Sequence, residues 1–119
     1  MKIIVVDDEP IIAETLVEIL KGEGHDALAF QTGDSVVEKA RIMRPDLVLA
    51  DVVMPRMNGI ELAKSLHKVM PHCRIILLSG NAESSELISN AREEGYQFEV
   101  LAKPIHPQRL LARINGGSL

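Results

Sequence analysis

The sequence predicts an α/β fold, in which helices cover both faces of a doubly wound, five-stranded parallel sheet. Its 119 residues suit a single compact domain. Short, unbroken aliphatic runs alternate with segments whose apolar residues recur at helical spacing, at about 20 to 25 residues per unit. Because parallel strands are buried on both faces and need helical crossovers, this alternation indicates right-handed β-α units. With 46% hydrophobic and 3% aromatic residues, the core is expected to be aliphatic.

The first β-α unit has the clearest pattern. Ile3–Val6 is a β-branched run typical of a strand that is buried on both faces. Pro10 suits the first position of the helix that follows, and Gly22 and Gly24 close that helix. The apolar residues at helical spacing between them are Ile12, Leu16, Ile19 and Leu20.

The second unit begins with a weaker strand candidate, Ala27–Phe30. Its helix is marked by the apolar residues Val36, Ala40 and Met43. The pattern Ser35-x-x-Glu38 predicts a capping box at the start of this helix.

The third unit repeats the buried-strand pattern at Asp46–Ala50, which runs directly into Asp51. In the loop that follows, Asn58-Gly59 indicates a turn. The next helix carries a stripe of apolar residues, and Pro71 ends it. The residues of this stripe are Leu62, Leu66 and Val69.

Two further strands complete the predicted sheet. Arg74–Leu78 leads into Ser79, and Glu99–Ala102 leads into Lys103. Glu83–Glu94 is helical in composition, and a last amphipathic helix contains Leu110, Leu111 and Ile114. The tail 116–118 is expected to be frayed or to be the stub of a linker.

Composition and charge exclude several classes of protein. A net charge of −4 argues against a sequence-independent grip on nucleic acid. The longest apolar runs, such as Ile75–Leu78, are far shorter than the roughly 18 residues of a membrane span. The acidic residues Asp7 and Asp8 come too early for a secretory signal. The single cysteine, Cys73, cannot form an internal disulfide, so we expect a cytoplasmic protein.

Polar side chains follow four of the predicted strands: Asp7 and Asp8, then Asp51, Ser79 and Lys103. Each has an ordinary explanation when it is taken alone. Asp8 could cap a helix, Ser79 could belong to a turn, and Lys103 could be solvated. Ligands of such sheets, however, bind at the carboxyl ends of the strands, so we expect these side chains to form one site.

Three carboxylates at one edge of a sheet require a cation or shifted pKa values, and a divalent ion is the better solution. At a separation of about 5 Å, each pair repels by roughly 3 kcal/mol at an effective dielectric constant near 20. Mg²⁺ is the expected ion, because it prefers oxygen ligands and the four histidines show no zinc-ligand spacing. An aspartate beside Mg²⁺ can accept a phosphoryl group, while Lys103 neutralises charge and the Ser79 hydroxyl donates to a phosphoryl oxygen. The added charge and acceptor oxygens would make a conformational switch.

Over nearly its whole length, the sequence resembles the receiver domain of bacterial two-component response regulators. The motifs that carry the resemblance are Val5–Pro10, Pro45–Gly59, Leu78–Gly80 and Lys103–Pro104. The resemblance implies one receiver domain over residues 1–119, with the flavodoxin-like strand order 2-1-3-4-5.

The resemblance assigns the phosphoacceptor and the metal ligands. Asp51 matches the phosphoacceptor, and Asp7 and Asp8 match the acidic pair that holds Mg²⁺. Asp51 itself and the backbone carbonyl of Val53 complete the protein ligands of the metal.

It also assigns the residues around the phosphoryl group. Ser79 matches the hydroxyl switch position, and Lys103 matches the lysine that contacts the phosphate. Pro104 is the candidate for a cis proline, since the trans preference of an X-Pro bond is small. Asn81, together with the side chain at position 53, matches the variable positions that tune hydrolysis.

The sequence departs from the family pattern before Lys103. The family usually has Tyr or Phe three residues before the lysine, where this chain has Val100, and the stretch 95–103 is one residue longer than usual. Phe98 falls on the same strand face as Val100 and is a candidate to replace the aromatic switch residue in part. Output through the loop after Ser79 or through the last helix is the other expectation.

The resemblance also implies partners. The phosphodonor would be a sensor histidine kinase or a histidine phosphotransfer protein, and the domain itself would catalyse the transfer and a slow hydrolysis. A downstream effector protein or domain would read the modified state, with no direct nucleic-acid binding by this domain and no membrane contact. Dimerisation through the fourth helix, fifth strand and fifth helix is common in the family, so a homodimer is one assembly it implies.

Three other functions fit the sequence less well. A receiver-like interaction module that is not phosphorylated is disfavoured because the acids, Ser79 and Lys103 are all present. A Mg²⁺-dependent hydrolase would need a second acid two residues after the nucleophile, where this chain has Val53. Dinucleotide binding would need glycines in the turn after the first strand, and Asp7–Pro10 has none.

Overall fold

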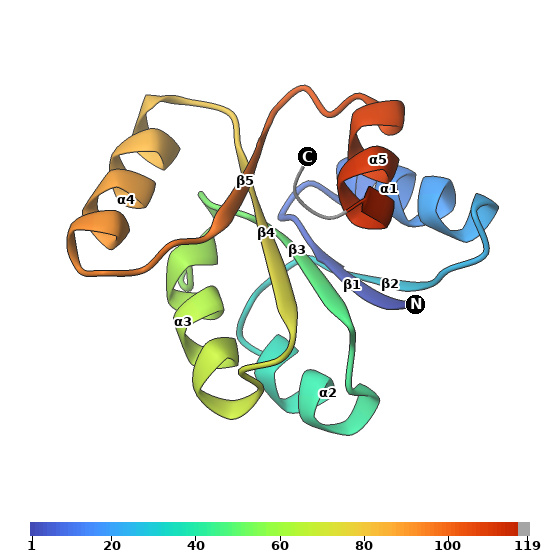
Figure 1. Ribbon diagram of the computed structural model, residues 1–119, viewed down its shortest axis with the longest axis horizontal. Helices are drawn as coiled ribbons and strands as arrows, with labels where there is room; N and C mark the ends of the chain where they lie inside the picture. The colour runs from blue at the N-terminus through green and yellow to red at the C-terminus, as the bar shows by residue number, and fades with distance from the viewer. Residues whose placement is uncertain (117–119) are drawn as a thin grey trace.

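The computed structural model describes residues 1–116 and contains one parallel sheet of five strands with the order β2-β1-β3-β4-β5 (Figure 1). The strands and helices alternate along the chain as β1 (Lys2–Val6), α1 (Pro10–Gly22), β2 (Asp26–Phe30), α2 (Val36–Met43), β3 (Leu47–Asp51), α3 (Gly59–Val69), β4 (Arg74–Ser79), α4 (Ala82–Glu93), β5 (Glu99–Ala102) and α5 (Pro107–Gly116). The predicted fold class and strand order are confirmed.

The helices divide between the two faces of the sheet, with α1 and α5 on one face and α2, α3 and α4 on the other (Figure 1). Alternate residues of each central strand therefore enter different cores. Ile4 of β1 and Val48 of β3 pack with α2 and α3, whereas Ile3 and Leu47 pack with α1 and α5. All of β3 is buried, which explains the unbroken apolar run of residues 47–50 before Asp51.

One sequence-based expectation for a helix start and one for a turn are wrong. Ser35 precedes α2, but its side chain makes no capping hydrogen bond, because its backbone is already helical (φ −98°, ψ −3°). Asn58 does not form a turn with Gly59. It is extended (φ −79°, ψ 170°) and caps α3 through a capping box with Glu61.

Smaller differences concern the ends of helices. Val69, expected in the buried stripe of α3, is 38% exposed, because α3 ends there and Met70 turns into the core instead. Gly116, expected in the tail, is the last residue of α5, while residues 117 and 118 lie outside the described part of the chain. Among residues 1–116, no helix has the length and apolarity needed to cross a membrane.

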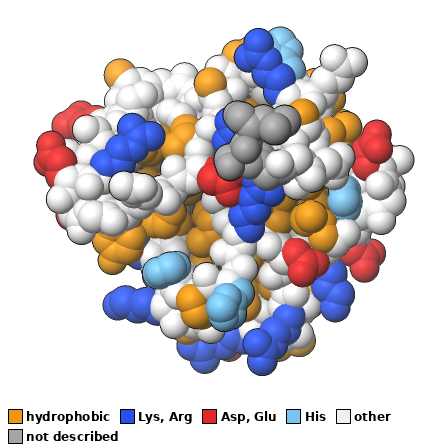
Figure 2. All heavy atoms as spheres, in the orientation of Figure 1, with side chains coloured by type: hydrophobic (Ala, Val, Ile, Leu, Met, Phe, Trp, Pro, Cys, Tyr) orange, Lys and Arg blue, Asp and Glu red, His pale blue; other side chains and the backbone are white. Residues whose placement is uncertain are grey.

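Charged side chains of both signs are interspersed on the face of the molecule shown in Figure 2. Basic side chains gather along the lower edge of this view, near α2, at the amino ends of the strands. The carboxyl ends of the strands, where the sequence analysis places the site, lie at the other end of the sheet.

Candidate functional site

The pairing of the central strands brings the three aspartates together. Val6 pairs with Ala50 across β1 and β3, so Asp7, which follows β1, lies beside Asp51, the last residue of β3. Asp8 follows directly, and one carboxylate oxygen from each of Asp7, Asp8 and Asp51 lies within 4.8 Å of the others. Asp7 and Asp51 are buried and Asp8 is exposed, so the cluster opens to solvent through Asp8.

Lys103 connects two of these carboxylates. Its Nζ lies 3.1 Å from Asp7 Oδ2 and 3.3 Å from Asp51 Oδ1. The other carboxylate oxygen of Asp7, Oδ1, accepts a hydrogen bond of 3.0 Å from the backbone N–H of Glu9. Asp7 is therefore held at both oxygens, as a fully buried carboxylate must be.

The charges of the cluster shift the pKa values of its members. Burial raises the pKa of Asp51 from 3.8 to about 6; Lys103 opposes the shift, and Asp7 and Asp8 add to it. Burial acts to lower the pKa of Lys103, but its hydrogen bond to Asp7 and the charges of Asp51 and Asp7 outweigh burial and raise it. Lys103 is therefore a permanent cation. Any further positive charge placed beside Asp51 would stabilise the ionised form of its carboxylate.

One glycine, Gly59, allows two backbone segments to approach closely beside the cluster. A Cβ at Gly59 would collide with the carbonyl oxygen of Asp51, and the Gly59 N–H donates a 2.8 Å hydrogen bond to the carbonyl of Val52. The loop between Asp51 and α3 is therefore pulled tightly against the end of β3. Val53, the expected carbonyl ligand, lies half-buried in this loop, two residues after Asp51.

Ser79, the last residue of β4, and Lys103, the residue after β5, lie next to each other at the carboxyl ends of these neighbouring strands. Ser79 pairs with Ala102, and the Lys103 N–H donates a 2.8 Å hydrogen bond to the Ser79 carbonyl. A Cβ at Gly80 would lie 3.2 Å from Lys103 Cδ, so the lysine chain passes over this glycine. The Lys103–Pro104 peptide bond is cis.

The structure gives the candidate switch residues different places. Val100 lies half-buried inside β5, and Asn81 caps α4. Phe98 precedes β5 and stacks on Tyr96, with ring centroids 5.6 Å apart. Phe98 and Val100 both pack against the core formed with α2, α3 and α4. Phe98 therefore shares the face of Val100 but stands at the end of β5 that is farther from Lys103.

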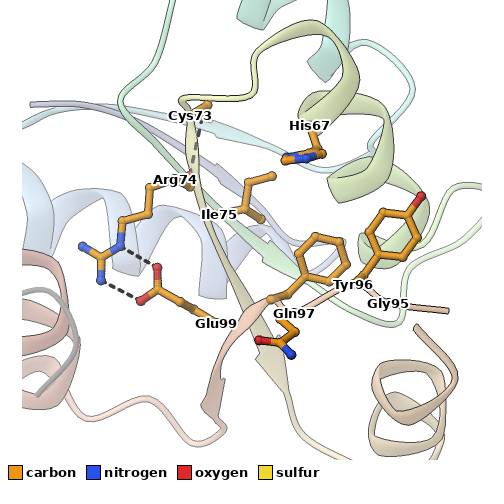
Figure 3. A pocket seen from close by; sticks show the side chains of 9 residues that line it. His67, Cys73, Arg74, Ile75, Gly95, Tyr96, Gln97 and Glu99 are labelled. Carbon is orange, nitrogen blue, oxygen red and sulfur yellow. Dashed lines mark hydrogen bonds and ion pairs between the residues drawn. The ribbon is translucent and has the colours of Figure 1, made fainter. Parts of the chain in front are cut away.

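A cavity of about 390 Å³ lies at this opposite end of β4 and β5 (Figure 3). Arg74 and Glu99 line it and form a bidentate ion pair, with Nε–Oε2 and Nη2–Oε1 distances of 2.6 and 2.7 Å. Arg74 also donates to the carbonyls of Arg113 and Ile114 at the end of α5. Burial, with the charge of Asp46, raises the pKa of Cys73 to about 11 and makes its thiol unreactive. The two charged side chains of this cavity bind each other, so the carboxylate cluster is the better candidate site.

Sequence reasoning did not find three residues that shape the site. The sequence predicts a turn at Asn58-Gly59, although Asn58-x-x-Glu61 carries the pattern of a capping box. Gly80 gave no signal, because its role depends on the path of the Lys103 side chain. Ser84 was also missed: it is buried, and its Oγ lies 2.7 Å from Ser79 Oγ.

Comparisons with known proteins agree with this geometry. A family model described as the response regulator receiver domain matches residues 3–115. The DNA-binding response regulator MtrA of Mycolicibacterium smegmatis is 35% identical over 113 residues, which cover 95% of this chain and 48% of MtrA, so the chain spans about half of that relative. The chemotaxis protein CheY of Thermotoga maritima is 30% identical over 115 residues, covering 96% of this chain and 94% of CheY. The crystal structure of a response regulator receiver domain protein from Clostridium thermocellum superimposes with a TM-score of 0.86 at 29% identity, covering 97% of this chain and 91% of that one.

Proposed function

Since this chain belongs to the response regulator receiver domain family, we propose that it is one receiver domain that acts as a phosphorylation-dependent signalling switch. Asp51 accepts the phosphoryl group, and the modified state is read by a downstream effector protein or domain. The observation that carries this proposal is the cluster of Asp7, Asp8 and Asp51 within 4.8 Å, with Lys103 bound to two of the three.

The donor set of the cluster fits Mg²⁺. Its three side chains offer carboxylate oxygens, and Asp8 leaves the cluster open to solvent, as suits an ion that retains several waters. Asp7, Asp8, Asp51 and the carbonyl of Val53 are the residues that would hold the ion. When bound, Mg²⁺ supplies positive charge at the oxygens of the phosphoryl group during transfer.

The chain's own groups perform the rest of the transfer. A carboxylate oxygen of Asp51 attacks the phosphorus of a phosphohistidine, a P–O bond forms, and the P–N bond breaks with its electron pair returning to the imidazole nitrogen. Asp51 must be ionised for this step, and its pKa of about 6 makes it so above neutral pH. The positive charge of Lys103 offsets the negative charge of the phosphoryl oxygens once the Asp51 carboxylate has been esterified. The Ser79 hydroxyl donates a hydrogen bond to one of these oxygens.

We assign the phosphodonor, a histidine kinase or histidine phosphotransfer protein, to an apolar groove beside the cluster. The groove has a volume of about 290 Å³ between α1 and the segment that follows β5. Ile11, which is 80% exposed, lines it together with Ile105, and Lys103 lines it as well. A partner helix seated there would therefore present its phosphohistidine next to Lys103 and Asp51. We place this exchange in the cytoplasm, where the free thiol of Cys73 would stay reduced.

Phosphorylation by a small donor tests the proposal. The protein is incubated with Mg²⁺ and acetyl phosphate, and its intact mass is measured for wild type and for Asp51→Ala. We expect the wild type to gain one phosphoryl group and the variant to gain none. Absence of a gain with every donor would favour the interaction module, and repeated turnover of small phosphate esters would favour a hydrolase.

A further inference from the structure

The Ser79 hydroxyl is bound by a residue of α4. Ser79 Oγ lies 2.7 Å from Ser84 Oγ, and Ser84 is 1% exposed although it stands in the first turn of the helix. Ser84 also takes part in the cap of α4: its Oγ donates to the Asn81 carbonyl at 2.8 Å and accepts from the Asn81 N–H at 3.2 Å. One hydrogen bond thus ties the end of β4 to the start of α4.

Counting hydroxyl protons gives this bond a direction. Each serine hydroxyl has one proton to donate and two lone pairs to accept with. Because Ser84 donates its proton to the Asn81 carbonyl, the proton between the two serines must come from Ser79. With the Asn81 N–H as second donor, both lone pairs of Ser84 Oγ are occupied. The only proton of Ser79 is therefore committed to Ser84.

A phosphoryl group on Asp51 adds an acceptor without adding a proton. If Ser79 donates to it, the Ser84 proton can go either to Ser79 Oγ or to the Asn81 carbonyl, but not to both. In each case α4 loses one hydrogen bond, either its tie to β4 or part of its cap. The two serines cannot satisfy the phosphoryl oxygen and the resting arrangement at once.

We propose that Ser84 is a positioning residue, which holds the Ser79 hydroxyl in the resting state and releases it to the phosphoryl group, thereby loosening the first turn of α4. This inference rests on the proposed function of Asp51. It assigns the response to α4 rather than to an aromatic residue of β5, where this chain has Val100.

The packing of α4 suits such a response. Only Ser84, Ile88 and Ala91 of its 12 residues are buried, and α4 stands at the side of the molecule beside α3 (Figure 1). A helix with so few buried residues opens at a low cost in free energy, so the loss of one hydrogen bond changes its opening measurably. Ser84 is the buried residue nearest the phosphoryl site, which makes it the point where the change enters the helix.

The first test measures the binding of a phosphoryl analogue. Fluoroberyllate with Mg²⁺ is titrated into wild type, Ser84→Ala and Ser85→Ala by calorimetry, which suits a chain without tryptophan. Ser84→Ala frees Ser79 in advance, so we expect it to bind the analogue about two- to tenfold more tightly, the worth of one net hydrogen bond. Ser85→Ala is the matched control, because Ser85 Oγ also donates to the Asn81 carbonyl, at 3.3 Å, but the structure shows no hydrogen bond between Ser85 and Ser79. Its affinity is expected to equal that of wild type.

The second test follows hydrogen exchange of the Ser84 and Ser85 amides by NMR. Fluoroberyllate with Mg²⁺ is expected to speed their exchange in wild type by about two- to tenfold. Ser79→Ala lacks the hydrogen bond between Ser79 and Ser84. In this variant we expect the Ser84 and Ser85 amides to exchange fast without ligand and no faster with fluoroberyllate and Mg²⁺. This variant leaves the α4 cap intact, and it serves equally if Ser84→Ala does not fold.

The outcomes separate this inference from the proposed function. If wild type binds fluoroberyllate, but Ser84→Ala binds no more tightly or the α4 amides do not respond, the role of Ser84 is overturned and the function of Asp51 stands. If Ser85→Ala tightens binding as much as Ser84→Ala, the role of Ser84 is again overturned. If wild type neither binds fluoroberyllate with Mg²⁺ nor gains a phosphoryl group, both fail.

Discussion

Replacing Asp51 by asparagine is expected to stabilise the metal-free protein above pH 6. Asp51 is only 8% exposed, and burial raises its pKa from 3.8 to about 6 despite the opposing charge of Lys103. Between these two values the native state binds more protons than the unfolded state, so stability falls as the pH rises through this window. Asparagine has nearly the shape of the neutral acid and does not ionise.

The expected gain follows from the shift. About two pKa units correspond to about 3 kcal/mol, fully present at pH 8 and absent below pH 4. The free energy of unfolding of wild type and Asp51→Asn is measured by urea denaturation with circular dichroism, in EDTA, from pH 4 to pH 8. Glu14→Gln, on the exposed side of α1, controls for the loss of one carboxylate.

Two results would refute this reasoning. One is a difference between the variants that does not change with pH, since titration of Asp51 would then not be its cause. The other is a wild type that is more stable than Asp51→Asn at pH 8 without metal, since the charged carboxylate would then gain more from Lys103 than it loses by burial. Added Mg²⁺ is expected to stabilise the wild type preferentially, because it binds the folded cluster.

Three further predictions concern other parts of the structure. Gly59→Ala places a Cβ against the Asp51 carbonyl and is expected to destabilise the protein by about 2 kcal/mol and to slow phosphorylation. Gly22→Ala is the control, because nothing lies within 4 Å of the added Cβ. It is expected to be neutral or stabilising in the same urea denaturation. Glu99→Gln removes the charge from the pair with Arg74, which lowers the pKa of Glu99, and is expected to cost about 1 kcal/mol at pH 7. Because the lowered pKa stabilises the fold above the unfolded-state pKa, that cost should disappear as the pH falls through the Glu99 titration, and a pH-independent cost would contradict the assignment. Ile11→Lys is expected to slow phosphorylation by a phosphohistidine protein but not by acetyl phosphate in the intact-mass assay, and equal slowing with both donors would remove the groove from the docking surface.

The sequence predicted the sheet and the cluster well because both follow from short patterns. Runs such as Ile3–Val6 can be satisfied only by strands buried on both faces, and the residue after each run must emerge at the same edge. The places of Asp7, Asp51 and Lys103 follow from that rule alone. The Ser35 capping box failed because a motif gives the side chain but not the backbone conformation that it needs.

The surroundings of the cluster were harder to predict because they depend on contacts between distant segments. Ser84 meets Ser79 only when the loop after β4 folds back into α4, and Gly80 matters only because Lys103 crosses it. Phe98 illustrates the same limit. The sequence correctly placed it on the same face as Val100, but it did not predict that Phe98 stacks on Tyr96 and so stays at the start of β5. Local periodicity carries no information on such pairings.

The contacts of Arg74 have a consequence for how the domain can move. This one guanidinium joins β4 to β5 through Glu99 and to the end of α5 through two backbone carbonyls. These hydrogen bonds hold the three elements together at the amino end of the sheet. Among the described residues, no hydrogen bond joins Ser79, at the carboxyl end of β4, to α5. Rearrangement of the loops after β4 and β5 would then tilt β5 and α5 about a fixed pivot instead of sliding them along β4.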